Sequence, residues 1–241
     1  MQVMLDVDEH HWWYRGRRAI IARELERLPI PLGARILDAG CGSGRTLVEL
    51  ARYGTVSAIE RSEQAAMLAS ARGAFDVRVG ELEQLPWPAG SFQLVTCLDV
   101  VEHTHDDVLA LRELWRVTMP GGWLVLTAPA YQSLWSSHDE ANHHYRRYSR
   151  AGLVAAITSA GWLVTRATSF NSLLLAPAAA MRLAQRRGLV GGGEETDLER
   201  GPAWMNRLLE LPLEAEARWL GSGRGLPAGL SLLAVARRAV D

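Results

Sequence analysis

Short apolar runs alternate along the chain with longer stretches in which apolar residues recur at helical spacing. The runs contain β-favouring residues, and several of them end at an acidic residue, which is typical of buried strands in a parallel sheet. The predicted strands begin at Ile36 and lie further along at 56–59, 77–79, 92–98, 123–128, 162–169 and 230–238. Strands that alternate with helices in this way predict an α/β fold with a doubly wound sheet.

Three glycines, Gly40, Gly42 and Gly44, follow the first predicted strand at every second position, close behind Asp38. Residues without a Cβ let the backbone turn sharply and let a ligand lie directly against it. A helical pattern begins after the turn, so the free N–H groups of that helix N-terminus face the same place. The dinucleotide pattern G-x-G-x-x-G needs a third glycine where this chain has Arg45, so the spacing disfavours a nicotinamide cofactor.

A second acid, Glu60, ends the next predicted strand, 22 residues beyond Asp38. In a doubly wound sheet this position lies at the carboxyl edge, beside the glycine-rich turn. A carboxylate there can accept hydrogen bonds from both hydroxyls of a ribose. NAD and S-adenosylmethionine (SAM) both contain a ribose, so Glu60 by itself predicts a nucleoside ligand and does not distinguish between them.

The arrangement Asp38-x-Gly40-x-Gly42-x-Gly44 resembles motif I of class I SAM-dependent methyltransferases. Segments 80–88 and 99–103 resemble those of the ubiquinone/menaquinone-biosynthesis type (methyltransferase type 11/12), and 36 to about 128 match that family in order. The resemblance implies a Rossmann-like, seven-stranded mixed sheet with strand order 3-2-1-4-5-7-6, an antiparallel strand 7, and a helical insertion between strands 6 and 7. One departure, Gln93 where relatives place aspartate, is expected to affect only the start of its strand.

The resemblance also implies SAM as the cofactor and predicts which residues bind it. An acid at the Glu81 position contacts the adenine amino group in that family, and the next backbone N–H, here that of Leu82, meets the ring. The adenine edge pairs a donor with an acceptor, which a carboxylate and an N–H complement, although Glu81 could also be a solvated loop residue. The predicted cofactor-binding residues are Asp38, Ala39, Gly40, Cys41, Gly42, Gly44, Glu60, Arg61, Glu81, Leu82, Leu98 and Asp99.

The chain divides into four predicted segments. These are an N-terminal helical flap at 1–35, a SAM-binding core at 36–169, a helical insertion at 170–228 and the last core strand at 229–241. In the flap, Trp12 and Trp13 either pack in the core or close over the cofactor. Within the insertion, apolar residues recur at Trp204, Leu208, Leu211 and Trp219. Its helices either pack on the domain or form a substrate lid or a membrane-surface element.

The stretch 129–150 follows the fifth predicted strand and concentrates histidines among aromatic residues and arginines. One interpretation is a structural loop in which Arg146 and Arg147 pair with the acids Asp139 and Glu140. The other is a substrate clamp with an acid/base histidine, because an imidazole is the natural base for an oxygen nucleophile near neutral pH. Candidate bases are His103, His138, His143 and His144, of which His103, His138 and His143 form the predicted catalytic set.

The composition of the chain limits the binding partners and the cellular location that we expect. The net charge is −1, and every one of the 26 basic residues is arginine. A near-neutral chain offers no broad electrostatic surface, so no nucleic-acid partner is expected, and the lack of lysine excludes a Schiff-base or lysine-base mechanism. No apolar run approaches the ~20 residues needed to span a bilayer. We therefore expect a cytoplasmic protein and leave open a peripheral contact with the inner membrane face through 172–187.

The expected function is SAM-dependent methyl transfer to a small-molecule or lipid-linked acceptor, at oxygen, nitrogen or carbon. One alternative is a non-catalytic SAM-binding regulatory protein that keeps the same cleft. Another is a metal-assisted 2′-O-methyltransferase, because Asp99-x-x-Glu102-His103 with a later histidine resembles the metal-binding set of small-RNA 3′-terminal 2′-O-methyltransferases. Asp99 is shorter by one methylene than the acid of that family, and the predicted site therefore contains no metal.

Overall fold

The protein, described here by a computed structural model over residues 9–186 and 203–240, is built on a seven-stranded sheet. Its order, β3-β2-β1-β4-β5-β7-β6, confirms the predicted fold class. The strands are β1 (Ala34–Ala39), β2 (Gly54–Glu60), β3 (Asp76–Val79), β4 (Phe92–Leu98), β5 (Thr118–Pro129), β6 (Leu163–Phe170) and β7 (Ser231–Arg237). Strand β7 runs antiparallel to both of its neighbours, as expected.

The strand registers bring the candidate functional segments to one edge of the sheet. Ala39, at the end of β1, pairs with Ile59 of β2 and with Cys97 of β4. Leu98, at the end of β4, pairs with Thr127 of β5. The residues that follow these four parallel strands therefore lie near one another at the carboxyl edge, where doubly wound folds bind their ligands.

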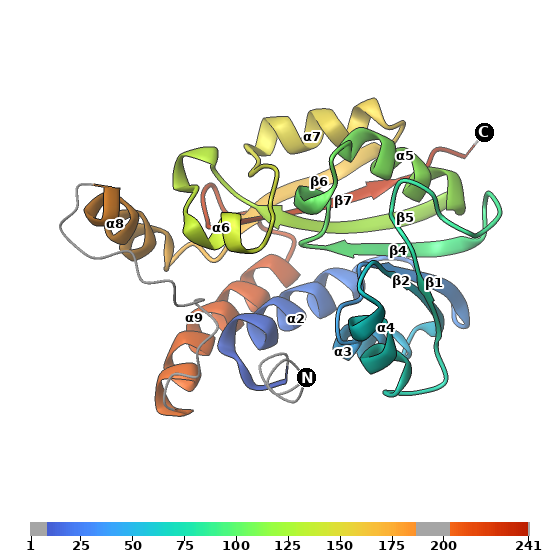
Figure 1. The fold of residues 1–241 in the computed structure, drawn as a ribbon, viewed down its shortest axis with the longest axis horizontal. Coiled ribbons are helices and arrows are strands. Elements are labelled where there is room, and N and C mark those ends of the chain that lie inside the picture. The colour runs from blue at the N-terminus through green and yellow to red at the C-terminus, as the bar shows by residue number, and fades with distance from the viewer. Residues whose placement is uncertain (1–8, 187–202, 241) are drawn as a thin grey trace.

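Helices cover both faces of the sheet (Figure 1). Helices α5 (Asp107–Val117) and α7 (Arg150–Ser159) lie on one face, and α2 (Trp12–Leu25), α3 (Arg45–Leu50), α4 (Glu63–Ser70) and α9 (Ala203–Gly221) lie on the other. Each face has its own apolar core, with Leu111 and Ile157 fully buried on the first and Ile20 and Leu213 on the second. Burial of each such side chain contributes roughly 1.5–3 kcal/mol, so both helical layers stabilise the sheet.

Helix α9, the last part of the insertion, packs along α2. Gly16 lies so close to Leu213 that a Cβ at Gly16 would come within 2.2 Å of the leucine Cδ1. Arg15 donates to the carboxylate of Glu210 at 2.8 Å. At the end of β6, the ring of Phe170 stacks on Trp13 with the ring centroids 5.7 Å apart. The N-terminal helix and the end of the insertion therefore form one packed layer.

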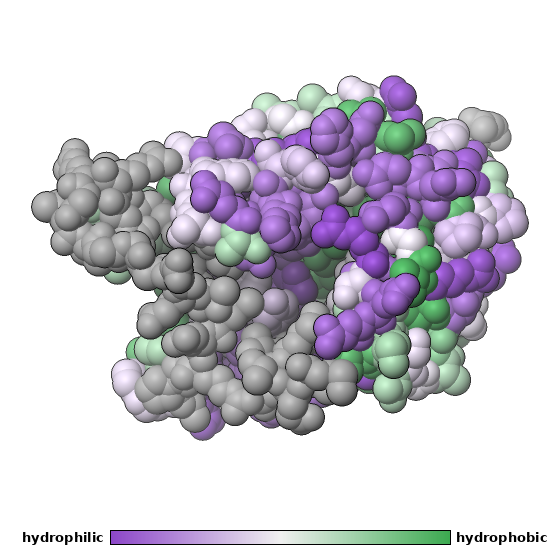
Figure 2. Space-filling view, viewed as in Figure 1, coloured by the Kyte–Doolittle hydropathy of each residue, from purple (hydrophilic) through white to green (hydrophobic). Residues whose placement is uncertain are grey.

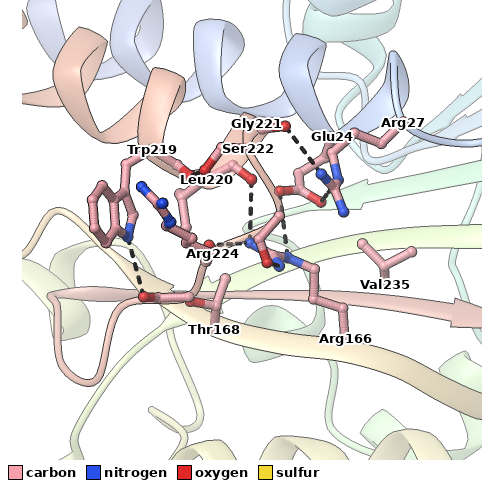
Figure 3. Close-up of polar contacts among 12 residues, drawn as sticks. Glu24, Arg27, Arg166, Thr168, Trp219, Leu220, Gly221, Ser222, Arg224 and Val235 are labelled. Carbon is pink, nitrogen blue, oxygen red and sulfur yellow. Dashed lines mark hydrogen bonds and ion pairs between the residues drawn. The ribbon is translucent and has the colours of Figure 1, made fainter.

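Arg166 of β6 ties this layer to the sheet (Figure 3). Its guanidinium donates to the backbone carbonyls of Gly223 and Arg224, just after α9, with both distances 2.6 Å. The same guanidinium lies 3.4 Å from the buried carboxylate of Glu24 on α2. Carbonyl groups at and after a helix end need partners from outside the helix, and Arg166 supplies them while it neutralises a buried acid.

Helix α8 (Leu175–Arg186) begins the insertion and extends away from the sheet (Figure 1). Within residues 9–186 and 203–240, no helix is both long enough and apolar enough to cross a membrane. Figure 2 shows that hydrophilic residues cover much of the face over α5 and α7, with small groups of hydrophobic residues between them.

Candidate active site

The glycine-rich turn between β1 and α3 has a backbone that favours glycine. Gly40, Gly42 and Gly44 have φ angles of 81°, 54° and 82°. A Cβ at Gly40 would lie 2.4 Å from Val100, and one at Gly44 would lie 2.6 Å from the backbone of Ala69. Among the described residues, nothing lies within 4 Å of the Cβ position of Gly42. The turn is therefore crowded at both ends and open at its centre, where a ligand can lie against the backbone.

Two acids flank this open position. Asp38 is 2% exposed, and its carboxylate accepts a hydrogen bond from the Thr96 hydroxyl at 2.6 Å. Glu60 accepts hydrogen bonds from the backbone N–H groups of Gly42 and Ser62, each at 2.9 Å. Because Glu60 contacts the N–H of the open glycine itself, its carboxylate and the turn can bind one ligand together.

The other predicted cofactor residues divide by burial. Ala39, Cys41, Leu82 and Leu98 have buried side chains. Burial raises the pKa of the Cys41 thiol, with the neighbouring carboxylates adding to the effect, so the thiol stays protonated. In contrast, the side chains of Glu81 and Arg61 are exposed. Their contacts with a cofactor therefore stay predictions.

The N-terminal segment reaches both the turn and the end of β4. Arg17 of α2 donates to the carboxylate of Asp99 at 2.5 Å. Asp99 directly follows β4 and has a φ of 58°, a strained conformation for a non-glycine residue that is frequent at functional sites. Arg72 donates to the Ser43 carbonyl of the turn at 2.6 Å and pairs with Glu9 at 2.8 Å. These contacts hold the N-terminal segment beside the glycine-rich turn and the end of β4.

A cluster of ionisable side chains lies beyond the end of β4, in and around the 3-10 helix η1 (Val101–His103). One candidate ligand atom from each of Glu102, His103 and His144 lies within 4.8 Å of the other two. The His103 and His144 rings meet edge to face, with their centroids 4.6 Å apart. A hydrogen bond of 2.8 Å from the Tyr145 N–H to the Glu102 carbonyl joins the two segments. The ends of β4 and β5 thus contribute side chains to one place.

Asp139, in the short helix α6 (Ser137–Ala141), holds the cluster in position. Its carboxylate is fully buried and lies 2.8 Å from Nδ1 of His144 and 2.7 Å from Nε of Arg147. Burial raises the pKa of Asp139, but the hydrogen bonds from His144 and Arg147 outweigh burial and hold it below its usual range. An ionised carboxylate at Nδ1 assigns the proton to that nitrogen and leaves Nε2 of His144 as an acceptor.

Glu102 and His103 have pKa values shifted in opposite directions. Glu102 is 1% exposed, and its Oε2 has no hydrogen-bond partner in the described part of the chain. Burial, with the charge of Asp99, raises the pKa of Glu102 well above its usual value. Burial, with the neighbouring His144, lowers the pKa of His103 to about 4. A carboxyl with a raised pKa therefore lies beside the neutral imidazole of His103 near neutral pH, and such opposed shifts are frequent at functional sites.

The structure brings one member of the predicted catalytic set, His103, into this cluster. His143 is exposed, and its backbone has a φ of 55°. The side chain of His138 lies outside the described residues. The second imidazole of the cluster belongs to His144. The sequence named His144 as a candidate base, but the predicted catalytic set did not include it. The local signal for His144 was an acid five residues earlier, Asp139, but only the turn after α6 brings the two together.

The loop after β5 contains part of the ion-pair set that the structural interpretation predicted. Arg147 pairs with Asp139 at 2.7 Å, as the structural interpretation predicted. Arg146 instead pairs with Asp107 of α5 at 3.0 Å, because α5 lies beside the loop. The hydroxyl of Tyr148 donates to the same Asp107 at 2.6 Å. The loop is therefore held by ion pairs, and it also brings His144 to Glu102 and His103.

Comparison with known proteins shows what part of this chain is similar to. Residues 37–126 match a family model described as a methyltransferase domain. A ubiquinone biosynthesis O-methyltransferase from Xanthomonas oryzae pv. oryzae is 33% identical over 143 residues, which cover 52% of this chain and 60% of that protein. A solved S-adenosylmethionine-dependent methyltransferase from Mesorhizobium loti is 18% identical, with a TM-score of 0.59, over 90% of this chain and 96% of the other. Residues 37–126 are therefore similar in sequence to a methyltransferase domain, and the chain shares its fold with a solved SAM-dependent methyltransferase.

The likeness to solved structures concerns the fold. The cyclase SpnF matches with the same TM-score of 0.59, at 20% identity, over 94% of this chain and 81% of SpnF. One fold thus carries different reactions, and the reaction has to be argued from the site. The chain spans about three fifths of the length of the curated relatives it matches.

Proposed function

We propose that the protein transfers the methyl group of SAM to an oxygen atom of a small-molecule acceptor. The observation that carries this proposal is the cluster of Glu102, His103 and His144 at the sheet edge that also holds the glycine-rich turn. A hydroxyl has to lose its proton to attack, and an imidazole can accept it near neutral pH. The Xanthomonas relative, named as an O-methyltransferase, favours the same class of acceptor atom.

Bound SAM supplies a methyl group on a sulfonium centre. The chain's own task is to hold that centre and the acceptor oxygen in line and close together. We assign Glu60 to the ribose hydroxyls because it lies beside the open Gly42. Glu81 and the Leu82 N–H are assigned to the adenine edge. The contacts of Arg17 and Glu9 keep the N-terminal segment near the cleft, where it can exclude water.

His144 is the base in this proposal. The Asp139 carboxylate orients its ring and stabilises the imidazolium that forms when Nε2 takes the acceptor's proton. His103 stays neutral, because its pKa of about 4 lies well below neutral pH, and packs edge to face against His144. The protonated carboxyl of Glu102 can donate a hydrogen bond to an acceptor oxygen. Two finer predictions remain. One is that the acceptor is lipid-linked, and the other is that 172–187 contacts a membrane.

The test is transfer of tritium from methyl-labelled SAM to a bacterial small-molecule extract freed of protein and nucleic acid. We expect labelled organic product from the wild type and about 100-fold less from His144→Gln. His143→Gln, the exposed neighbour, is the matched control and should keep most of its activity. If the wild type binds S-adenosylhomocysteine but labels nothing, the proposal fails and a non-catalytic SAM-binding protein takes its place.

Metal-assisted methylation of a nucleic-acid 2′-hydroxyl is the second candidate, favoured by one observation. The ligand atoms of Glu102, His103 and His144 are close enough to share one ion, and Asp139 holds His144 as outer carboxylates hold metal-binding histidines. Two imidazoles and a carboxylate suit Mn²⁺ better than Mg²⁺. The test measures methyl transfer to the same extract and to an RNA oligonucleotide, in EDTA and after added Mn²⁺. Transfer that EDTA leaves unchanged rules out the metal, and no transfer to RNA rules out the nucleic-acid acceptor.

A further inference from the structure

We propose that α9 is a membrane-surface helix whose outward apolar stripe binds an anionic phospholipid bilayer. This inference goes beyond methyl transfer and does not depend on the identity of the acceptor. The stripe, as used below, consists of Trp204, Leu208, Leu211 and Trp219. These four side chains are 67%, 57%, 56% and 45% exposed.

The stripe follows one side of the helix. Its residues are separated by four, three and eight positions, which places them on one side at 3.6 residues per turn. The two tryptophans stand near opposite ends, 15 residues and therefore roughly 22 Å apart along the axis. Large apolar side chains that are exposed singly are ordinary, but four on one side of a helix indicate an interaction surface.

The opposite side of α9 already has a partner. Leu213, Ala217 and Leu220 are at most 3% exposed and belong to the core that α9 shares with α2. A surface helix of a soluble domain needs one apolar side to pack on the core. The stripe is a second apolar side, so packing within the described chain leaves it unexplained. Because the first side anchors the helix, the stripe is presented on a rigid element.

Positive charge accompanies the stripe. Arg207 and Arg218 lie along one of its margins and are exposed, and Arg218 also pairs loosely with Glu214 at 3.7 Å. Near the end of the stripe, the guanidinium of Arg224 lies over the ring of Trp219, 4.6 Å from its centroid (Figure 3). Tryptophan with arginine is the pair that suits the boundary between acyl chains and headgroups.

A basic depression adjoins the stripe where α2 and α9 end together. It has a volume of about 460 Å³ and is lined by Arg23, Glu26, Arg27, Arg218, Gly221 and Ser222. Three arginines face one glutamate there, and Arg218 belongs both to the depression and to the margin of the stripe. Anionic headgroups attract the arginines of this depression. Each arginine near a membrane surface adds roughly 1 kcal/mol of attraction. This charge favours an anionic bilayer over a second copy of the near-neutral chain as the occupant.

Co-sedimentation with vesicles tests the inference. The full chain is mixed with vesicles of phosphatidylcholine alone and with vesicles that contain roughly one third phosphatidylglycerol. We expect sedimentation with the anionic vesicles, weakened at ~1 M salt because salt screens the arginines. The double variant Leu208→Glu/Leu211→Glu should reduce the partition coefficient at least about tenfold. Met67→Glu, at a 74% exposed apolar residue on α4, is the matched control and should bind as the wild type does.

A charge-reversal pair sharpens the test. Arg218 and Arg52 have equally exposed side chains, 75% each, and each pairs with a glutamate three or four residues earlier in the chain. We expect Arg218→Glu to reduce anionic-vesicle binding several-fold and Arg52→Glu to leave it unchanged. Calorimetry with S-adenosylhomocysteine verifies that each variant is folded. Ligand binding and methyl transfer test the proposed function, whereas vesicle binding tests this inference, so the failure of one can be told from the failure of the other.

Three results would overturn the inference. The first is a wild-type protein that sediments with neither vesicle. The second is binding that the double variant leaves unchanged. The third is self-association in sizing chromatography that the double variant abolishes, since that assigns the stripe to a second copy of the chain.

Discussion

The candidate site has two parts, called its walls below, that are built in different ways. The wall after β1 and β2 consists of backbone: the open Gly42 and the N–H groups that Glu60 accepts. The wall after β4 and β5 consists of side chains, with Asp139 holding His144 beside Glu102. A backbone wall depends on neighbouring residues in the sequence, whereas a side-chain wall depends on loops that meet only in the fold. We therefore expect the first to respond to added bulk and the second to changes of charge.

The largest expected effect concerns the backbone wall. Gly42→Val places methyl groups where the ligand lies and should weaken S-adenosylhomocysteine binding by more than about 1000-fold in calorimetry. Gly33→Val is the matched control, because Gly33 also has a positive φ, 71°, and no described atom near its Cβ position. Both variants carry about 1–2 kcal/mol of backbone strain. Equal affinity of the two variants for the ligand would remove the glycine-rich turn from the cofactor site.

The side-chain wall should respond to loss of one charge. Asp139→Asn cannot stabilise an imidazolium at His144, and we expect kcat to fall about 100-fold with little change in the KM for SAM. Asp107→Asn removes the charge that Arg146 and Tyr148 contact on the same loop without touching His144. We expect that control to lose only a few-fold in kcat. Similar losses in both variants would mean that Asp139 acts through loop structure alone.

The buried position of Glu102 should lower the free energy of unfolding near neutral pH. Its pKa is raised in the folded state, so its contribution to stability is present at low pH and is lost as pH rises. Glu102→Gln keeps the shape without an ionisable group, and we expect its Tm at pH 7 to rise by about 2–4 °C, which corresponds to about 1 kcal/mol. Methyl transfer should fall at the same time. If the Tm difference between Glu102→Gln and the wild type is no larger at pH 7 than at pH 4, the raised pKa is contradicted.

His103 should give the smallest effect. Its folded-state pKa of about 4 lies below the ordinary value of 6.5, so the unfolded chain binds more protons between these limits. Stability should therefore fall as pH drops from about 6.5 to 4. His103 is only partly buried, so we expect its share of this fall to be about 1 kcal/mol in the free energy of unfolding. His103→Gln should lose that share, as measured by urea unfolding at the two pH values. His143→Gln should keep the wild-type slope, and identical slopes in all three proteins would contradict the shift.

The sheet and the backbone wall could be predicted because their signals are local. Apolar runs marked the strands, and the capping residues Ser62 and Ser149 stand at the starts of α4 and α7 as their side chains suggest. The start of β5 was missed: the pattern indicated 123, whereas the strand begins at Thr118, which pairs with Phe92 before a bulge. The strand starts at Thr118 because of a contact with another strand. No apolar run in the sequence marks that start.

The side-chain wall could be predicted only as a set of candidates. The choice between His143 and His144 depends on the turn after α6, where His143 takes a φ of 55° and its neighbour reaches Asp139. The partner of Arg146 could not be foreseen either, because Asp107 lies on α5, far away in the sequence. In α9, the periodic apolar residues proved to be the exposed stripe, while the less obvious Leu213 and Ala217 form the packed side.

The most direct test of the account is a crystal structure with S-adenosylhomocysteine bound. The account predicts that the ribose hydroxyls bind the Glu60 carboxylate beside Gly42, and that the sulfur faces the cluster of Glu102, His103 and His144. A nucleoside bound away from the glycine-rich turn, or a sulfur that points away from the histidines, would contradict it.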